Sequence, residues 1–220
     1  MLSINWQSSM RLRKVKNLEK RIEQTKAFIL EDNEIEKGRW KFFFVNNNPI
    51  HLEIGMGKGK FISTLAKNNP NINYIGLEKE ISCLIKAAEK LEERVNNLIF
   101  VHFDASNILD IFGENEVDKI YLNFSDPWPK ARHAKRRLTA ANNLKKYIQI
   151  LKSPCDIEMK TDNNDLFAFS VESFKEVGFD VLELTNDLHK DKDNIITTEY
   201  EDKFVQAGEK INYIHVNYRK

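Results

Sequence analysis

The sequence has few cysteines and no long hydrophobic run. Its two cysteines, Cys83 and Cys155, stand in different segments without the spacing of a metal site, so we expect free thiols in a reducing cytoplasm rather than a disulfide. No apolar stretch approaches the roughly 20 residues of a membrane-spanning helix. Residues 1–11 also lack the apolar core of a secretory signal. These absences predict a cytoplasmic protein without a membrane partner.

A strong excess of charge is also missing. The 34 lysines and arginines nearly balance the 33 aspartates and glutamates, and the formal net charge is +1. This total neither requires nor excludes a polyanionic partner, because local patches matter more. One locally basic stretch runs from Arg11 to Arg21 with only Glu19 opposing it, and a second, residues 130–137, contains no acid. Such a run is either a solvated face or a binding surface, and the first stretch by itself favours neither.

From Pro49 onward, short apolar runs alternate with helical patterns. The expected strands are residues 50–54, 73–78, 97–103, 119–124 and 156–160, the expected helices are residues 60–68, 81–93, 139–151 and 164–177, and residues 179–185 and 211–218 form an expected closing antiparallel pair. Strands that alternate with helices imply right-handed βαβ units and a parallel sheet. Residues 42–220 are therefore predicted to form one α/β domain. Residues 1–41 show no strand pattern and are interpreted as an N-terminal basic extension.

Glycines occupy alternate positions after the first expected strand, at Gly55, Gly57 and Gly59. Without side chains, they let the backbone turn sharply and approach a ligand closely. The dinucleotide-binding pattern G-x-G-x-x-G would need a further glycine at position 60, which is a lysine. The phosphate-binding loop G-x-x-x-x-G-K-[ST] would need a glycine at position 54 and a hydroxyl residue at position 61, and both are absent. The spacing therefore disfavours both of these nucleotide sites.

Acidic residues stand at the ends of the first three expected strands. Glu53 precedes the glycines and makes the segment resemble motif I of class I S-adenosylmethionine methyltransferases. Glu78 ends the second strand, where a carboxylate can accept hydrogen bonds from ribose hydroxyls. Asp104 follows the third strand, within reach of an adenine amino group, and Glu53 would pair with the methionine ammonium. The alternative is that these acids are helix N-caps or surface residues.

The fourth expected strand leads into Asn123-Phe-Ser-Asp-Pro-Trp-Pro-Lys130. Pro127 and Pro129 fix φ and stiffen the loop. A stiff loop at the carboxyl end of a strand can hold Asp126 and Trp128 in set positions, as an active site requires. The alternative is a rigid turn with a buried tryptophan.

With this loop, the chain resembles the bacterial tRNA (guanine-N7-)-methyltransferases of the TrmB type. The matching segments are Glu53-Ile-Gly-Met-Gly-Lys-Gly59, Ile75-Gly-Leu-Glu78, Asn123 to Lys130, Arg132-His-Ala-Lys-Arg-Arg-Leu138, Lys160-Thr-Asp162-Asn163 and Thr198-Glu-Tyr-Glu201. They span about residues 50–215 in the family's order. A departure is Ala131, where relatives often carry another lysine. The resemblance implies a Rossmann-like class I methyltransferase with a mostly parallel seven-stranded sheet, an antiparallel last strand and helices on both faces.

The resemblance also implies a role for each matching residue. The cofactor S-adenosyl-L-methionine would be bound by Glu53, Gly55, Gly57, Glu78, Asp104 and Asp126, with Asp126 also catalytic. The substrate would be held by Lys130, Asp162, Thr198, Glu199, Tyr200 and Glu201, and RNA by Arg132, His133, Ala134, Lys135, Arg136 and Arg137. The implied substrate is the variable-loop guanine of tRNA, position 46, and the enzyme would act as a monomer or homodimer without a metal.

The chemistry of guanine N7 is consistent with these roles. Methyl transfer from a sulfonium is an in-line displacement, so placing the reactants is much of the task. N7 carries a free lone pair and needs no general base, while the product base is cationic. Asp126 would therefore stabilise the developing charge or orient the base. Asp162 and Glu201 would accept hydrogen bonds from N1 and the amino group of guanine. Charge reversal at Arg136 and Arg137 is expected to weaken tRNA binding in a salt-dependent way.

Other classes of protein remain alternatives. Another Rossmann-type methyltransferase would act on an exocyclic amine or a small molecule, and it would lack the Trp-Pro-Lys segment and the basic run. An RNA-binding module with a degenerate methyltransferase fold would fail to bind S-adenosylmethionine. A nicotinamide oxidoreductase is disfavoured by the glycine spacing. No set of His, Cys, Asp and Glu shows metal-site spacing, and His51, His102 and His215 are interpreted as hydrogen-bonded structural residues.

Overall fold

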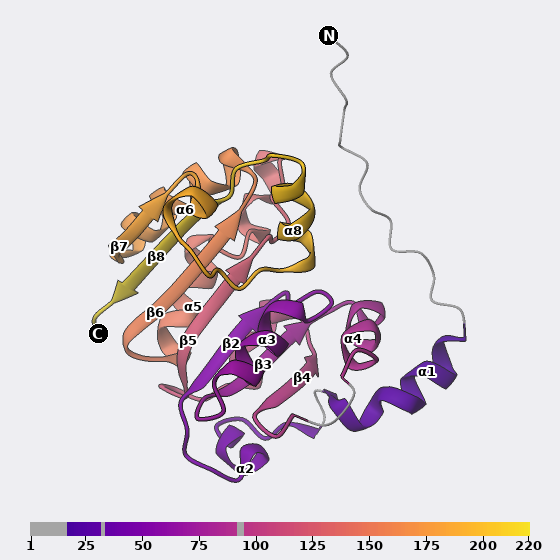
Figure 1. Cartoon of the computed structure of the whole chain (residues 1–220). Coiled ribbons are helices and arrows are strands. Elements are labelled where there is room, and N and C mark those ends of the chain that lie inside the picture. Colours follow the sequence, from indigo (N-terminus) through magenta and orange to yellow (C-terminus); the bar gives the residue numbers. More distant parts are fainter. Residues whose placement is uncertain (1–16, 32–33, 92–94) are drawn as a thin grey trace.

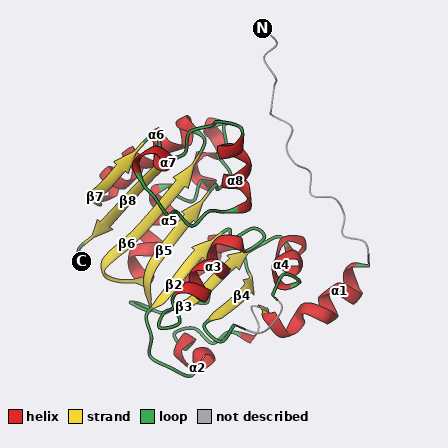
Figure 2. Cartoon of the chain, in the orientation of Figure 1, coloured by secondary structure: helices red, strands yellow, loops and turns green. Residues whose placement is uncertain are grey.

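The computed structural model describes residues 17–31, 34–91 and 95–220. They form one twisted eight-stranded sheet with the strand order β1-β4-β3-β2-β5-β6-β8-β7. Every strand pair is parallel except those of β8, which runs antiparallel to both β6 and β7. The predicted α/β class, the mostly parallel sheet and the antiparallel last strand are confirmed (Figures 1 and 2).

The elements follow one another as strands and helices through most of the chain. The strands are β1 Ile29–Glu31, β2 Ile50–Ile54, β3 Asn73–Glu78, β4 Leu98–His102, β5 Val117–Asn123, β6 Leu151–Thr161, β7 Asp180–Thr185 and β8 Asn212–Tyr218. The α-helices are α1 Leu18–Thr25, α2 Trp40–Phe44, α3 Lys60–Asn68, α4 Ile81–Ala88, α5 Ala141–Ile150, α6 Asn164–Val177, α7 Leu188–Asp191 and α8 Glu199–Gln206. Three 3-10 helices complete the set: η1 Lys26–Phe28, η3 Ala105–Asp110 and η4 Ala131–Arg136.

The structure adds one strand to the seven expected. β1 lies within residues 1–41, for which the sequence predicts no strand, and pairs in parallel with β4. Three residues are too few for a strand periodicity, so only the partner strand stabilises this segment. Ile29 is buried there. The basic residues of the expected extension up to position 16 lie outside the described residues.

Two other expected boundaries shift by five residues, and the rest by at most two. β6 begins at Leu151, five residues before the expected start, because Leu151 pairs with Val117 of β5 across a local irregularity in register. α4 ends at Ala88, earlier than the expected residue 93, and positions 92 and 93 are outside the described part. In the residues that are described, no helix has both the length and the apolar composition to cross a membrane.

Two hydrophobic cores cover the two faces of the sheet. Alternate residues of the strands face each core, as pleating requires. The larger core packs α2, α5 and α6 against β2, β5, β6 and β8, and its members include Trp40, Leu144 and Phe174. The smaller core packs α3 and α4 against β3 and β4. Figure 1 shows α3 in front of the sheet and α5 behind it.

The centre of the sheet marks the position where a ligand is expected. β2 and β5 are neighbours, and the chain adds β3 and β4 on one side of them and β6 and β8 on the other. Open α/β sheets bind ligands at such a switch point, in the crevice outside the carboxyl ends of the strands. The loops after Ile54 and Asn123 begin at this edge, and α8 lies beside it (Figure 1).

Candidate active site

The glycine loop between β2 and α3 has the backbone that its sequence predicts. Gly55, Gly57 and Gly59 all have positive φ, at 76°, 57° and 74°, a conformation that costs other residues about 1–2 kcal/mol. A Cβ on Gly55 or Gly57 would meet no atom within 4 Å, whereas one on Gly59 would lie 3.0 Å from Cβ of Ala87. The first two glycines therefore border open space, and the third lets α3 pack closely against α4.

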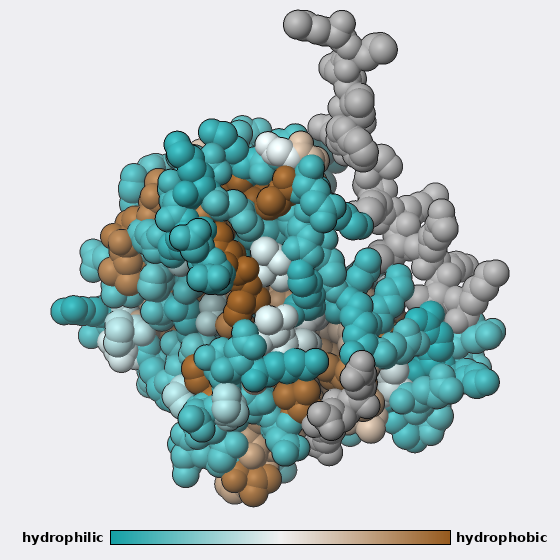
Figure 3. All heavy atoms as spheres, viewed as in Figure 1, coloured by the Kyte–Doolittle hydropathy of each residue, from teal (hydrophilic) through white to brown (hydrophobic). Residues whose placement is uncertain are grey.

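The space beside the glycine loop is a cavity of about 200 Å³. Its lining comes from the carboxyl ends of β2 and β5, the glycine loop, α4 and α8, and consists of Glu53, Gly55, Met56, Gly57, Lys58, Cys83, Asn123, Phe124, Thr198, Glu199, Tyr200 and Lys203. Figure 3 shows hydrophobic and near-neutral residues in the middle of this face, framed by hydrophilic ones. The predicted cofactor loop and the first three residues of the predicted substrate segment thus share one cavity.

Glu53 is a buried acid on the wall of this cavity, with only 1% of its surface exposed. Nδ2 of Asn123 donates a hydrogen bond to its Oε1 over 2.9 Å. Its Oε2 is buried and has no hydrogen-bond partner among the described residues. Burial raises the pKa of Glu53 to about 8, although the hydrogen bond from Asn123 and the positive charge of Lys160 act against this rise. A cationic donor from a ligand would satisfy the free oxygen and favour the ionised form.

Glu78 and Asp104, two further acids predicted to bind the cofactor, lie at the same edge of the sheet. Glu78 accepts a backbone hydrogen bond from Gly57 on Oε2 and another from Glu80 on Oε1, both over 3.0 Å, and burial raises its pKa. Asp104 caps η3 by accepting from the backbone N–H of Ser106 over 2.8 Å, and this bond lowers its pKa. Asp104 is therefore an N-cap, the alternative weighed for these acids, and its contact with adenine stays a prediction.

The loop after β5 has unusual backbone geometry. Phe124 and Trp128 have positive φ, 50° and 42°, which is uncommon for residues other than glycine and concentrates at functional sites. Asp126 lies between them and is exposed. Phe124 lines the cavity and lies 5.2 Å from the ring of Tyr200. The loop thus connects the cavity wall to the exposed acid.

The predicted RNA-binding run forms η4 directly after this loop. Lys130, Arg132, Lys135 and Arg136 are exposed, while His133, Ala134 and Arg137 are partly buried. The guanidinium of Arg136 lies over the ring of Trp128, 5.0 Å from its centroid, and the ring of His133 contacts the same tryptophan edge-on. The exposed cations therefore follow directly on the loop that carries Asp126, and their contact with RNA stays a prediction.

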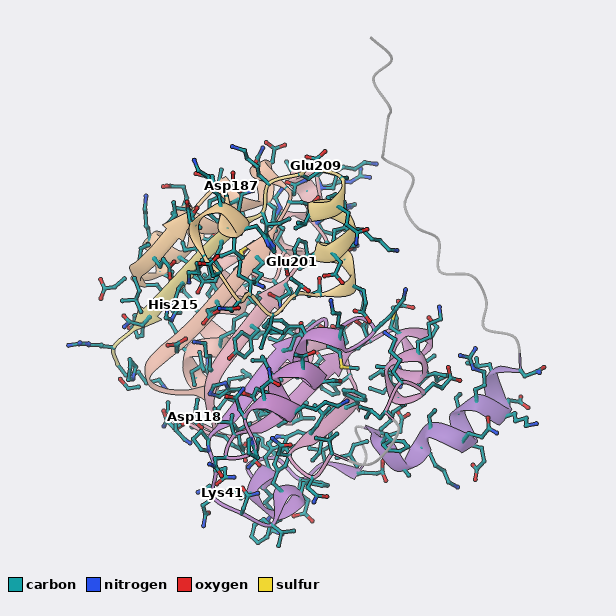
Figure 4. The ribbon with its side chains drawn as sticks, in the orientation of Figure 1. Lys41, Asp118, Asp187, Glu201, Glu209 and His215 are labelled. Carbon is teal, nitrogen blue, oxygen red and sulfur yellow. The ribbon has the colours of Figure 1, made fainter. Side chains whose placement is uncertain are left out.

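The predicted substrate segment begins α8 with a capping box. The side chain of Thr198 accepts from the N–H of Glu201, and the Glu201 carboxylate accepts from the N–H of Thr198. Thr198, Glu199 and Tyr200 line the cavity. Glu201 is fully buried between α8 and the sheet (Figure 4). Its burial favours a supporting role over the expected contact with guanine.

Lys160 of β6 is the buried partner of Glu201. Its Nζ lies 3.2 Å from Glu201 Oε2 and donates to the carbonyl of Ile196 over 2.8 Å. His189 also reaches Glu201, with Nε2 2.8 Å from Oε1. Burial lowers the pKa of Lys160 despite the opposing charge of Glu201. This network joins the segment before α8 to the strand that carries Asp162, so it sets the position of the predicted substrate residues.

The remaining predicted substrate residues lie outside the cavity lining. Lys130 is exposed at the start of η4. Asp162 follows β6 and is half-buried, and this burial raises its pKa. Both lie after strands of the same carboxyl edge, because β5 and β6 are parallel neighbours. Their contacts with the base stay predictions.

Comparisons with known proteins agree with this geometry. A family model described as "Putative methyltransferase" matches residues 47–214. The tRNA (guanine-N(7)-)-methyltransferase of Lachnoclostridium phytofermentans is 50% identical over 206 residues, which cover 92% of this chain and 96% of the relative. That of Clostridioides difficile is 45% identical over 205 residues, with 92% and 96% covered. The chain belongs to the tRNA (guanine-N7-)-methyltransferase family.

Solved structures of lower sequence identity share the fold. The 16S rRNA methyltransferase KamB aligns with a TM-score of 0.66 at 11% identity, over 84% of this chain and 95% of that one. An antibiotic-related methyltransferase aligns with a TM-score of 0.64 at 18% identity, over 87% and 95%. These likenesses concern the fold alone, and they confirm the Rossmann-like α/β fold predicted from the sequence.

The cavity suits the methyl donor expected for this family. S-adenosylmethionine carries an ammonium, and the free Oε2 of Glu53 lacks a partner of that kind. A Cβ at Gly55 or Gly57 would project into open space, which a ligand can occupy when no side chain is there. The residues present therefore fit the methyl donor.

The sequence predicts no role for two residues that the structure places at this site. Asn123 only begins a matching segment, yet it holds Glu53. Lys160 was likewise part of a motif without a role, yet it anchors Glu201. The available signal was their polar character on otherwise apolar strands, which demands buried hydrogen-bond partners.

A separate polar cluster lies on the sheet face near His215 (Figure 4). Asp156, Glu158 and His215 present ligand atoms close enough together to hold a metal ion. Lys119 already pairs with both carboxylates, at 3.0 Å from Asp156 and 2.6 Å from Glu158. His215 Nε2 lies 3.0 Å from Asp156. The ammonium of Lys119 supplies the positive charge that these acids require.

Proposed function

We propose that this chain transfers a methyl group from S-adenosylmethionine to N7 of a guanine in tRNA, namely the variable-loop guanine at position 46. Membership of the tRNA (guanine-N7-)-methyltransferase family supports the reaction. The observation that carries the proposal is the unsatisfied Oε2 of Glu53, placed in one cavity with the glycine loop and the start of α8. A buried acceptor without a partner is costly unless a ligand completes it.

In this proposal the methyl donor would be held by Glu53, Glu78, Asp104 and the glycine loop. When bound, it supplies an electrophilic methyl group. Asn123 holds the Glu53 carboxylate by its Oε1, so that Oε2 would be free to accept a hydrogen bond from the ammonium of the donor. The glycine loop brings backbone close to the donor without side chains between them. These contacts fix one of the two reactants, which is much of the work in a displacement.

The other reactant would be placed by residues of the β5 loop, β6 and α8. Thr198, Glu199 and Tyr200 border the cavity from α8. Asp162, which follows β6 outside the cavity lining, would contact the base from the same edge of the sheet. Asp126 would face the purine as N7 is alkylated, where a carboxylate stabilises the positive charge that develops on the base. No proton leaves N7 in this step, so a general base is unnecessary.

The exposed cations of η4 would hold the RNA. Arg132, Lys135 and Arg136 lie beside the active-site loop, and contacts of such cations with phosphates position the RNA without reading its sequence. The domain expected at 42–220 would also include β1 and Trp40, because β1 pairs with β4 and Trp40 lies in the larger core. Because its substrate would be tRNA, we expect the enzyme in the cytoplasm, and we expect a monomer or a homodimer, which sedimentation equilibrium distinguishes.

Incubation with radiolabelled S-adenosylmethionine and unmodified tRNA tests the proposal. The expected result is label in tRNA, followed by strand scission at position 46 under conditions that cleave at N7-methylguanosine. A tRNA transcript in which guanine 46 is replaced by adenine is the matched control and should remain unlabelled. Label on an exocyclic amine, or none despite binding of the donor, would overturn the proposal.

A further inference from the structure

Arg137, the last cation of the basic run, is directed into the protein rather than toward solvent. Its Nε donates a hydrogen bond to the carbonyl of Pro127 over 2.9 Å, and its Nη2 donates to the carbonyl of Trp128 over 3.2 Å. One planar guanidinium thus binds two consecutive carbonyls of the loop that carries Asp126. Within residues 17–31, 34–91 and 95–220, no carboxylate forms an ion pair with it.

These two bonds hold a segment that has few other constraints. In the part of the chain that the structure describes, no other side chain donates a hydrogen bond to the backbone of residues 125–130. Trp128 has a φ of 42°, a conformation that costs about 1–2 kcal/mol in a residue with a side chain. Such a conformation persists only where its surroundings fix it, and Arg137 supplies that fixing contact.

Arg137 is itself held from two helices. Nδ2 of Asn143 donates to its carbonyl over 2.8 Å, and the N–H of Ala140 donates to the same oxygen over 3.0 Å, so the start of α5 fixes the backbone. Its guanidinium lies over the ring of Phe169 in α6, 4.3 Å from the centroid, a favourable cation–π contact. The loop is therefore connected through Arg137 to the core behind the sheet.

Its neighbour Arg136 makes a different set of contacts. Arg136 is exposed and its guanidinium lies over the ring of Trp128, without a hydrogen bond to the loop backbone. The two adjacent arginines share charge and sequence context but differ in direction. Arg136 is therefore a matched control for Arg137.

We propose that Arg137 is a positioning residue that holds Asp126 in place, and that it does not contribute a phosphate contact. This separates the basic run into an exposed RNA-binding part, Arg132 to Arg136, and an internal latch. The effect of Arg137 on the rate of methyl transfer rests on the proposed function, because Asp126 acts on the base in that proposal. The effect of Arg137 on the loop does not rest on it: replacing Arg137 should release the loop whatever the enzyme methylates.

The kinetic experiment compares Arg137→Lys with Arg39→Lys, a substitution at the exposed N-cap of α2, outside the candidate active site. Lysine keeps the charge but cannot bind two carbonyls as the planar fork does. We expect kcat of Arg137→Lys to fall about 10- to 100-fold, as misplacing a reacting group does, with an unchanged KM for tRNA. Arg39→Lys should keep both values near those of the wild type. A wild-type kcat in Arg137→Lys would overturn the proposal.

The salt dependence of tRNA binding separates a latch from a phosphate contact. Removal of one phosphate contact lowers the slope of log K against log salt by about 1. We expect that decrease for Arg136→Gln and an unchanged slope for Arg137→Gln. A decrease in the slope for Arg137→Gln would show that it binds RNA and would contradict the proposal.

Limited trypsin digestion of the protein alone tests the latch independently of its activity. Lys130 and Arg132 are exposed cleavage sites at the end of the loop. Cleavage at these sites, followed by mass spectrometry, should be severalfold faster in Arg137→Gln and unchanged in Arg136→Gln, because a released loop opens locally. Thermal melting checks that each variant folds, and Arg137→Lys replaces Arg137→Gln if the latter does not. An unchanged cleavage rate overturns the latch, whatever the substrate of the enzyme proves to be.

Discussion

Asn123 donates from Nδ2 to Oε1 of Glu53 over 2.9 Å, so the amide at the end of β5 holds the carboxylate near the end of β2. The two strands are neighbours at the switch point of the sheet. Because Asn123 engages only one oxygen, Oε2 remains available for a cationic group of a ligand. The pair therefore holds a buried carboxylate oxygen in position to accept a hydrogen bond from a cation. In an apolar environment such a charge-assisted hydrogen bond is strong.

Replacing Glu53 with glutamine should change both cofactor binding and the pH dependence of stability. We expect the affinity for S-adenosylmethionine, measured by calorimetry, to fall about 10- to 100-fold through loss of a buried charged hydrogen bond. Burial raises the folded-state pKa of Glu53 from 4.5 to about 8. As pH rises, the unfolded state therefore loses this proton at a lower pH than the folded state does. Between about pH 5 and about pH 8 the unfolded state is favoured increasingly, and the wild type loses stability.

Glutamine does not titrate, so the free energy of unfolding of Glu53→Gln should lack this fall with pH. The stability of the variant relative to the wild type should therefore increase across this window. Urea unfolding at pH 5, 6.5 and 8 measures the difference. Parallel pH profiles for the two proteins would contradict the raised pKa.

Alanine at two glycines of the loop should separate ligand binding from folding. Gly57→Ala places a Cβ with no atom within 4 Å beside the cavity, so it should weaken cofactor binding and destabilise the fold by only about 1 kcal/mol for the positive φ. Gly59→Ala meets Ala87 at 3.0 Å and should destabilise more. Thermal unfolding and cofactor titration of both variants measure this. Equal losses of stability would refute the distinction.

Removal of the Asp126 carboxylate should slow methyl transfer. We expect Asp126→Ala to lower kcat about 100- to 1,000-fold, as the loss of a preorganised charge-stabilising group does. Asp126→Asn should lose nearly as much if the charge matters, and much less if the residue only orients the base. Asp180→Ala, an exposed acid on the edge strand β7, is the control. Single-turnover methylation by Asp126→Ala at the wild-type rate, with unchanged cofactor affinity, would remove the catalytic role.

Breaking the buried pair of Lys160 and Glu201 should be costly to the fold. Lys160 is 5% exposed and Glu201 is fully buried, so Lys160→Met leaves a buried carboxylate with His189 as its remaining side-chain partner. We expect a loss of about 3–5 kcal/mol in the free energy of unfolding. The double variant Lys160→Met/Glu201→Gln should recover part of this loss, as urea denaturation will show. A double variant less stable than Lys160→Met would contradict this account.

Charge reversal in the exposed part of the basic run should weaken tRNA binding. Arg132→Glu and Lys135→Glu should each raise the Kd for tRNA and flatten its dependence on salt, because each removes a phosphate contact. Lys175→Glu, on α6 and 57% exposed at its side chain, changes the charge equally and should have little effect. Filter binding between 50 and 200 mM salt, a range that changes such contacts strongly, measures this. Equal effects of all three reversals would show that only net charge matters.

The local sequence specified most of the sheet and its helices. β2, β3, α3 and α6 have the predicted bounds, because each has a clear apolar periodicity and a glycine, proline or polar residue near its ends. β1 was not predictable in this way. It is three residues long and depends on pairing with β4, which no local pattern encodes.

The sequence by itself determined the family and predicted the chemistry of the site. The glycine spacing and the segment from Asn123 to Lys130 are contiguous in sequence, and the acids follow successive strand patterns, so their order and identity can be read directly. These features indicated the methyl donor and tRNA, and the relatives confirm the family.

The tertiary structure decided which side chains line the cavity and which are buried behind them. Glu201 and Arg137 belong to matching motifs, yet one is buried against Lys160 and the other binds the loop that carries Asp126. The direction of a side chain depends on partners that are distant in sequence, here β6 for Glu201 and α6 for Arg137. A buried charge must find such a partner, and only the folded chain brings the two together.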